Sequence, residues 1–226
     1  MRTRRAVAGA ALILVVAAGC AGGGGSESGR PAARILSDAQ AAAQAADSVT
    51  IAGTVARGST TGPGATTATI ELVLTSSGDG RERITGAGQD IDLIRVGQTL
   101  YVKGLSAPGA TSAYERLPAT DPRAAPLIAQ LDKKTVFDQL IKAGDTTAVT
   151  GTATVAGQPA VKLTPGNGAG ALYVADDAAH PYPLEVETSP SGAASGATAA
   201  PGPTGALMFT GWNAHTVISP PTGTGS

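Results

Sequence analysis

Cysteine and histidine are scarce in this chain of 226 residues, which limits the chemistry that it can carry out. Cys20 is the only cysteine, and His180 and His215 are the only histidines. One thiol cannot form an intrachain disulfide, and these residues fall short of the three or four converging ligands of a typical metal site. The sequence also lacks a Gly-x-Ser-x-Gly nucleophile elbow. We therefore expect no metal, no cofactor, no catalytic residue and no enzymatic activity.

A long apolar run is missing as well. The most hydrophobic stretch is residues 6–19, and as a helix it would reach about 21 Å, short of the roughly 30 Å hydrocarbon core of a bilayer. It follows Arg2, Arg4 and Arg5 and ends in small residues, which is the pattern of a secretory signal peptide. We expect residues 1–19 to be a signal peptide rather than a permanent membrane span.

Cys20 directly follows this stretch. The sequence Ala17-Ala18-Gly19-Cys20 resembles the bacterial lipobox, in which the cysteine is acylated and becomes the first residue of the mature chain. Ala17 departs from the commonest form, which has leucine there. The alternative is an ordinary secretory signal that happens to contain a cysteine, but an unpaired thiol on an exported protein needs an explanation. The resemblance implies acylation of Cys20, for example with palmitate, and a lipid-anchored protein on the outer face of the cell membrane.

The chain carries no large excess of either charge. Removing the three arginines of the signal peptide from the 16 basic side chains leaves 13 against 17 acidic ones, a net charge of −4. Such a balance gives no electrostatic footprint for a nucleic acid. We therefore expect no nucleic-acid partner.

Composition divides the chain into a tether, one domain and a tail. Residues 20–32 are rich in glycine and serine and predict a flexible tether. Residues 33–219 are long enough for a single domain with one core. Residues 220–226 predict a disordered tail. Within the domain, residues 189–203 are of low complexity and predict a long loop.

Hydrophobic periodicity predicts helices around a series of short strands. Apolar residues at helical spacing predict helices over 31–47, 124–131 and 134–143. Alternating residues and turn signals predict strands, joined by short connections, and a loop over 105–118. The phase of the alternation shifts at Leu93-Ile94, as a bulge would cause. The predicted strands are 49–55, 70–75, 81–85, 91–96, 99–103, 148–155, 159–164, 171–175, 183–188, 206–212 and 216–218.

Short connections imply antiparallel pairing, and helices segregated from the strands imply an α+β layer packing. We expect a large curved antiparallel β-sheet with the helices packed on its concave side.

This order of elements and several of its sequence motifs resemble actinobacterial lipoproteins of the LppX/LprG type and, more distantly, the LolA/LolB lipoprotein carriers. The motifs are the strand and turn patterns at 94–104, 155–163, 172–175, 180–184 and 209–212. The resemblance implies a half-barrel that holds the acyl chains of a lipid or glycolipid in an apolar cavity. It also implies a role in lipid transport across the cell envelope.

Apolar residues on one face of the predicted sheet and on the two middle helices are the candidates for lining such a cavity. The same residues could simply form the core. The candidates are Ile70, Leu72, Leu74, Leu93, Leu100, Val102, Phe137, Leu140, Ile141 and Leu172.

Carboxylates and aromatic residues give weaker signals. Asp90 and Asp92 share one strand face, where we expect them to be solvated. Asp176-Asp177 predicts a turn, with weak calcium binding as a distant alternative. Tyr182 could lie at the mouth of a pocket or pack at a sheet edge.

Two functions follow from these observations. The first is a membrane-anchored extracytoplasmic lipoprotein that binds a lipid or another amphiphile in an apolar cavity. The alternative is a lipoprotein with a filled core, which would act as a scaffold and bind a partner protein in the cell envelope. The sequence leaves the identity of any protein partner unknown.

Overall fold

The fold is described by a computed structural model over residues 25–57, 66–86, 88–105, 113–141, 147–166, 168, 170–188 and 204–222. The predicted signal peptide, Cys20, the loop over 189–203 and residues 223–226 of the predicted tail lie outside these ranges. None of the described helices is long and apolar enough to span a bilayer.

Three helices and eleven strands make up the described part of the chain. The helices are α1 (Ala32–Ala45), α2 (Ala124–Gln130) and α3 (Lys133–Leu140). The first six strands are β1 (Ser48–Arg57), β2 (Thr66–Thr75), β3 (Gly80–Gly86), β4 (Gln89–Val96), β5 (Thr99–Lys103) and β6 (Glu115–Pro118). The other five are β7 (Ala148–Val155), β8 (Gln158–Thr164), β9 (Gly170–Ala175), β10 (Pro183–Thr188) and β11 (Thr204–Thr210).

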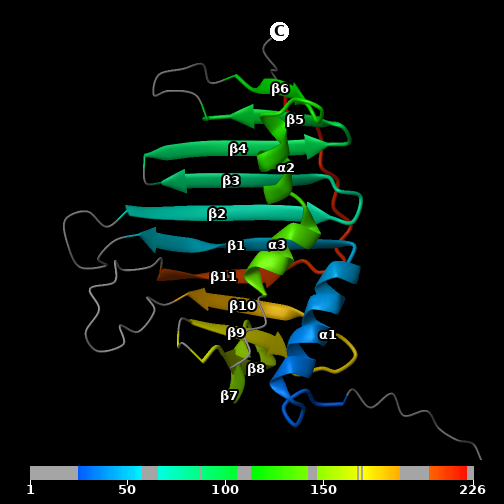
Figure 1. The fold of residues 1–226 in the computed structure, drawn as a ribbon, viewed down its shortest axis with the longest axis vertical. Helices are drawn as coiled ribbons and strands as arrows, with labels where there is room; N and C mark the ends of the chain where they lie inside the picture. The colour runs from blue at the N-terminus through cyan, green and yellow to red at the C-terminus, as the bar shows by residue number, and fades with distance from the viewer. Residues whose placement is uncertain are drawn as a thin grey trace, which may run out of the picture.

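All eleven strands belong to one antiparallel sheet in the order β6-β5-β4-β3-β2-β1-β11-β10-β9-β8-β7 (Figure 1). The chain winds outward from β1 to β6, and β7 to β11 return to pair with the other side of β1. The sheet is open, because β6 and β7 are its two edges rather than partners. The predicted α+β class with a large antiparallel sheet is confirmed.

The helices cover one face of this sheet, which we call the inner face (Figure 1). On α1 the residues that point toward the sheet recur at helical spacing, and Ile35, Leu36, Ala39 and Ala43 are buried. The Asp132 side chain accepts a hydrogen bond from the Thr135 N–H at 2.7 Å and so caps the start of α3. Removing the apolar helix and strand residues from water is the main stabilising contribution to this layer.

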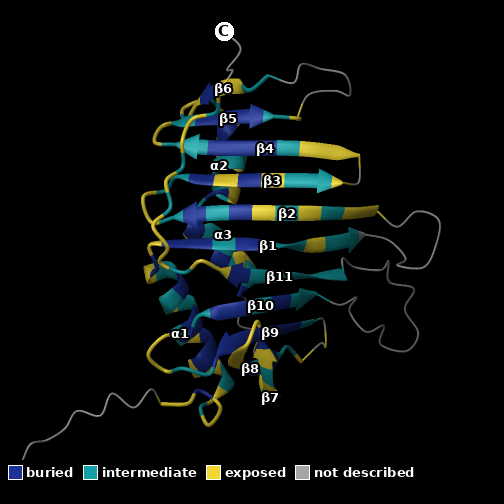
Figure 2. Ribbon diagram, turned by 180° about the vertical axis from the view of Figure 1, so that it is seen from behind, coloured by how far each residue is buried: buried dark blue, intermediate teal, exposed yellow. Residues whose placement is uncertain are grey.

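Side chains alternate between the inner face and the opposite, outer face, because successive residues of a strand point to opposite sides. Val49 and Ile51 of β1 lie on the inner face in register with Leu74 and Leu72 of β2. The outer face is seen in Figure 2, where β2 and β4 carry exposed residues. The helix-covered face therefore holds the main core.

Three local predictions differ from the structure. The segment predicted as a loop over 105–118 contains β6, which pairs with β5 through Leu117 and Leu100. Residues 216–218 form no strand; the chain after β11 instead runs across the ends of the strands toward β6 (Figure 1). The predicted bulge at Leu93-Ile94 is wrong, because β4 pairs with β3 and β5 in continuous register.

The apolar residue that caused the apparent phase shift lies on the outer face. Ile94 is 4% exposed and sits in register with Arg81 on β3 and Tyr101 on β5. The long side chains of these two neighbours have apolar stems and rings that can cover it. An outer-face position in the middle of a wide sheet can therefore be apolar without breaking the strand.

The two edges of the sheet differ in length and charge. β6 is four residues long, carries Glu115 and Arg116, and ends at Pro118. β7 is eight residues long, has the sequence Ala-Val-Thr-Gly-Thr-Ala-Thr-Val and carries no charge. Short, charged and proline-containing edges resist pairing with other strands, whereas long uncharged edges favour it.

The segment before α1 is held against the loop between β9 and β10. The Asp176 carboxylate accepts hydrogen bonds from the Ser26 hydroxyl and from the backbone N–H groups of Glu27 and Ser28. The Ala178 N–H donates to the Gly25 carbonyl oxygen at 2.8 Å. Of the tether predicted over 20–32, the part from Gly25 onward is therefore docked on the domain, because the Asp176 carboxylate satisfies several of its polar groups.

Candidate functional site

The predicted lining residues gather in one place. Nine of the ten candidates belong to the main core cluster under the helices, and eight of these are buried. The tenth, Ile70, is half-buried on the same face of β2, in register with Ile84. The alternation of the strands thus identified residues that share the inner face, and most of them are packed against one another.

An apolar cleft opens between α1, the end of α3 and strands β8 to β10. Its volume is about 180 Å³. Three of the predicted residues line it, namely Leu140 and Ile141 at the end of α3 and Leu172 on β9. Leu36 of α1 and Leu163 of β8 add further apolar walls. We call this the inner cleft, because it leads under the helices toward the core.

A second cleft, of about 320 Å³, lies at the other end of the helix layer. Val102 of β5, Leu117 of β6 and Leu127 of α2 form its apolar part. At its rim, Arg123 forms ion pairs with Glu115 at 2.8 Å and Asp121 at 2.9 Å. Of the predicted lining residues only Val102 lies here.

A buried carboxylate interrupts the apolar inner face. Glu82 of β3 is 9% exposed and stands in register between Leu72 of β2 and Leu93 of β4. Its Oε2 atom has no hydrogen-bond partner among the described residues. Burial raises the pKa of Glu82, because loss of water disfavours the charged carboxylate. The burial of Glu82 could not be predicted from its strand alone, since an alternating strand normally presents such a charge to solvent.

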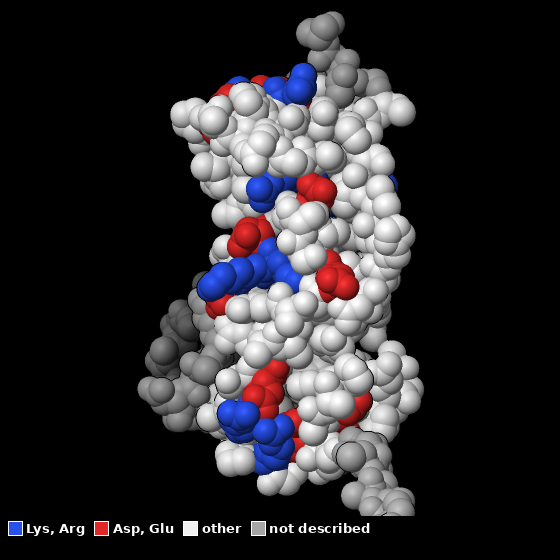
Figure 3. Space-filling view, turned by 90° about the vertical axis from the view of Figure 1, so that its right-hand side faces the viewer, with Lys and Arg blue, Asp and Glu red and all other residues white. Residues whose placement is uncertain are grey.

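Polar side chains connect α1 to α3, and we call this contact of Gln40 and Gln44 with Asp138 the joint. The Asp138 carboxylate on α3 accepts hydrogen bonds from Gln40 and Gln44 of α1 at 2.7 and 3.1 Å. Lys134 lies 2.5 Å from the same carboxylate, and their hydrogen bond lowers the pKa of Asp138. In the side view of Figure 3, basic and acidic side chains lie next to one another in this way rather than in patches of one sign.

The expected solvated face at Asp90 and Asp92 needs a correction. Both are on the outer face, but only Asp90 is exposed, and Asp92 is 6% exposed. Arg81 donates to the Asp92 carboxylate from Nε at 3.1 Å and from a terminal nitrogen at 2.6 Å, and the Tyr114 hydroxyl donates at 2.7 Å. Asp92 is therefore buried by its own partners, which alternation along one strand could not reveal.

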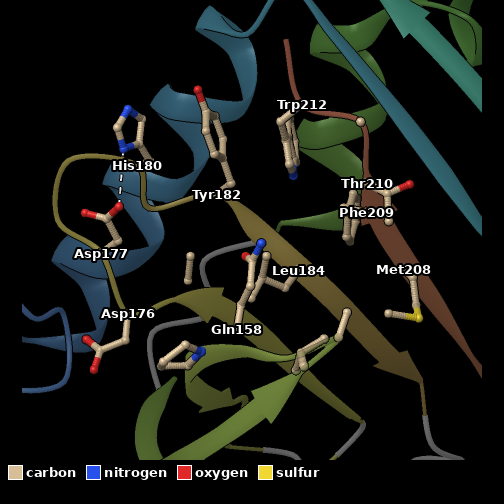
Figure 4. A pocket seen from close by; sticks show the side chains of 15 residues that line it. Gln158, Asp176, Asp177, His180, Tyr182, Leu184, Met208, Phe209, Thr210 and Trp212 are labelled. Carbon is tan, nitrogen blue, oxygen red and sulfur yellow. Dashed lines mark hydrogen bonds and ion pairs between the residues drawn. The ribbon is translucent and has the colours of Figure 1, made fainter. Parts of the chain in front are cut away.

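The outer face of β7 to β11 carries a second apolar cluster, which the periodicity of the single strands did not predict. Its buried members are Val155, Ala160, Ala171, Tyr173, Ala175 and Leu184, with Met208 packed against them. Next to it lies a cleft with a volume of about 590 Å³ (Figure 4). We call it the outer cleft. Its walls come from three separate segments, 155–159, 175–184 and 208–212, and Tyr182 was the residue that the sequence placed at a pocket mouth.

A row of stacked aromatic rings joins the outer cleft to the core. Tyr182 and Trp212 stack with ring centroids 4.7 Å apart. Trp212 in turn packs against Phe209 of β11 and Phe137 of α3, at 6.2 and 5.7 Å. His180 stacks on the outer side of Tyr182 with ring centroids 6.2 Å apart and is exposed. Aromatic stacking of this kind fixes ring positions.

The described part of the chain offers no metal site, since no three His, Cys, Asp or Glu side chains converge in it. Asp176 and Asp177 lie in the turn that their sequence predicts. The Asp177 carboxylate accepts a hydrogen bond from the Ala179 N–H at 2.9 Å and contacts His180 at 3.2 Å. These contacts lower the pKa of Asp177.

Comparison with known proteins gives a likeness of fold. No family model matches the chain, and no curated protein matches its sequence. The crystal structure of LprF from Mycobacterium bovis matches with a TM-score of 0.53 and 14% identity, over 84% of this chain and 96% of that one. Lipoprotein LppX from Mycobacterium tuberculosis matches with a TM-score of 0.51 and 13% identity, over 83% of this chain and all of that one (100%).

A LolA superfamily protein from Nitrosomonas europaea matches with a TM-score of only 0.27 and 14% identity, over 80% of this chain and 92% of that one. At these identities the likeness shows the fold alone. The similarity predicted from the strand and turn motifs is confirmed at that level: the chain has the fold of the actinobacterial lipoproteins LprF and LppX.

Proposed function

We propose that this protein is a lipoprotein of the cell envelope that binds a lipid or another amphiphile between its sheet and its helices, without covalent chemistry. Acylation of Cys20 anchors it to the outer face of the cell membrane. The observation that carries the proposal is the inner cleft, an apolar opening lined by Leu140, Ile141 and Leu172, in a domain with the fold of LprF and LppX.

The small side chains of α1 favour such binding. Its buried face consists of Ile35, Leu36 and the alanines Ala39 and Ala43. Alanines leave a thin contact between a helix and the sheet, so a modest shift of α1 would widen the inner cleft toward the size of ordinary ligand sites, about 300–1,000 Å³. Each methylene group of an acyl chain that leaves water for this space contributes about 0.8 kcal/mol.

The polar joint between α1 and α3 would limit and guide this shift. Asp138 is held by Gln40 and Gln44 through single hydrogen bonds at a half-buried position. Such bonds contribute only about 0.5–1.5 kcal/mol each and exchange readily with water. The joint therefore holds α1 near α3 in the closed form, and its bonds can be replaced by water when α1 moves to widen the inner cleft.

The proposal is tested by native mass spectrometry of the chain exported with its own signal and carrying Cys20→Ser, purified without detergent. We expect a stoichiometric lipid that organic extraction releases and identifies. Leu140→Gln puts an amide into the inner cleft and is expected to lower lipid occupancy severalfold, because burying an unpaired amide among apolar groups is costly. Val136→Gln is the matched control, since Val136 is also half-buried on α3 but does not line the cleft.

A mass without bound lipid that stays unchanged after incubation with envelope lipids would overturn the proposal and favour the scaffold alternative. Equal lipid occupancy in Leu140→Gln and Val136→Gln would move the binding site away from the inner cleft.

A further inference from the structure

The outer cleft lies beside the apolar cluster of the outer face, at the turn end of β7 to β11, and shares none of the lining residues of the inner cleft. It opens between the turn of β7 and β8, the loop of β9 and β10, and the end of β11 (Figure 4). Its volume of about 590 Å³ is within the usual range for sites that bind small molecules. It is therefore a separate site with its own walls.

The floor and one side of the outer cleft are formed by apolar and aromatic side chains in fixed positions. Leu184 and Met208 contribute to the floor, and Tyr182 and Trp212 line it from one side. The Trp212 Nε1–H donates to the Pro183 carbonyl oxygen at 3.2 Å, and Asn213 donates to the Tyr182 hydroxyl at 2.8 Å. Because both rings are also stacked on each other, the site is preformed, and a ligand loses little free energy in ordering it.

The rim is acidic. Asp176 and Asp177 lie on one side of the cleft, where the Asp176 carboxylate accepts hydrogen bonds from the segment before α1 and the Asp177 carboxylate accepts one from the Ala179 N–H (Figure 4). His180, the one basic side chain that lines the cleft, contacts Asp177. Such a rim attracts hydroxyl or ammonium donors and repels phosphate or carboxylate groups, since like charges brought together at a binding site are unfavourable.

The chain enters the fold beside this cleft. Asp176, which lines the cleft, also binds Ser26, Glu27 and Ser28, and Ala178 of the same loop binds Gly25. Gly25 is the fifth residue after Cys20, and five residue steps at full extension reach at most about 18 Å. An acyl anchor on Cys20 would therefore keep the outer cleft close to the membrane surface.

We propose that the outer cleft is a second amphiphile site, in which one acyl chain lies on the apolar floor and a headgroup with hydroxyl or ammonium donors lies at the carboxylate rim. The choice of a membrane amphiphile as occupant rests on the anchoring at Cys20 proposed above. Lipid binding at the inner cleft is not required for it.

The test uses the emission of Trp212, which is the only tryptophan of the chain and lines the outer cleft. The Cys20→Ser chain is titrated with dodecyl maltoside and, separately, with dodecyl phosphate, each below its critical micelle concentration. The two probes share one chain and differ in headgroup. We expect a saturable shift with the maltoside and binding at least about tenfold weaker with the phosphate.

Two variants on β11 form a matched pair. Met208→Gln places an amide on the floor and is expected to weaken maltoside binding at least about fivefold, because apolar contact with the chain is lost. Ala206→Gln makes the same kind of change two residues away on the same face, outside the cleft, and should leave the titration unchanged. Leu140→Gln in the inner cleft should also leave it unchanged.

No saturable response below the critical micelle concentration would overturn the proposal, and so would equal affinity for the two probes. A response lost in Leu140→Gln and kept in Met208→Gln would assign the signal to the inner cleft and overturn it too. If the chain carries no extractable lipid but Trp212 still responds as expected, the proposed function fails while the outer site holds.

Discussion

The two arms of the sheet on either side of β1 differ in how they use their faces. The first arm, β2 to β6, is apolar on its inner face, and its outer face is tied together by the Arg81–Asp92–Tyr114 contacts. The second arm, β7 to β11, has an apolar cluster on each face and carries the inner and outer clefts, although Lys162, Glu185 and Glu187 also lie on its outer face. The second arm therefore buries apolar side chains on both sides of its strands, whereas the first arm does so mainly on the side that the helices cover.

Truncating one leucine in each arm should give the largest effects and the clearest contrast. Leu100 is fully buried in the first arm, whereas Leu172 in the second arm is 8% exposed and borders the inner cleft. We expect Leu100→Ala to lower the free energy of unfolding by about 3–5 kcal/mol and Leu172→Ala by about 2–3 kcal/mol, because the cost depends on the cavity that remains. Urea unfolding measures both, and equal losses would contradict the distinction between the arms.

Removing the buried carboxylate of the first arm should stabilise it. Glu82→Leu replaces an unpartnered group between Leu72 and Leu93 and is expected to raise the free energy of unfolding at pH 7 by about 1–3 kcal/mol. Glu82→Gln, which removes only the charge, should give a smaller gain. A loss of stability in both variants would mean that the carboxylate has a binding partner in the native protein.

The same residue predicts a pH dependence with a definite sign. Because burial raises the pKa of Glu82 above its ordinary value of 4.5, the folded chain binds a proton more readily than the unfolded chain. The stability linked to this group is complete below that ordinary value and is lost as the pH rises through the higher pKa of the folded state. As the pH rises through this window, the free energy of unfolding should fall more in the wild type than in Glu82→Leu.

The outer face of the first arm should respond to loss of its ion pair. Asp92→Ala removes the acceptor for Arg81 and Tyr114, and we expect a loss of about 1–2 kcal/mol, since Arg81 is half-exposed and its charge can be solvated. Asp90→Ala on the same strand face is the control and should change stability by less than about 0.5 kcal/mol. Thermal unfolding of the two variants side by side gives the comparison.

The smallest effect on stability is expected at the docking point of the N-terminal segment on the second arm. Asp176→Ala removes the acceptor for Ser26, Glu27 and Ser28, and the global stability should fall by less than about 1 kcal/mol. Hydrogen exchange of residues 25–30 should nevertheless become much faster. Asp177→Ala serves as the control, because its hydrogen bonds stay within its own loop. Unchanged protection in Asp176→Ala would show that other contacts hold the segment.

Much of the fold could be predicted from the sequence, because period and turn chemistry are local. Alternation in β2 and β4 correctly assigned Leu72, Leu74 and Leu93 to one face, and helical spacing found α1 and α3. The prediction failed where the structure depends on residues that are distant in the sequence. β6 is a strand because its backbone pairs with β5, and Ile94 is buried because side chains on β3 and β5 lie beside it.

The candidate sites followed the same division. The inner-cleft residues Leu140, Ile141 and Leu172 were among those predicted, because each belongs to an apolar pattern within its own helix or strand. The outer cleft could not be predicted, because it is assembled from two turns, the end of β11 and the chain beyond it. Docking of the segment before α1 also depends on Asp176, which lies about 150 residues away in the chain.

The unlike edges of the sheet set a limit on how copies of this chain can associate. If two chains join through the uncharged β7 strand, the shared surface is the same patch on both, and the union has twofold symmetry. What remains at the outer ends is β6 on each side, with its charged residues and Pro118. Association of the chains then ends at a closed dimer rather than continuing as a fibre. On a crowded membrane surface the chains would therefore form dimers but not longer assemblies.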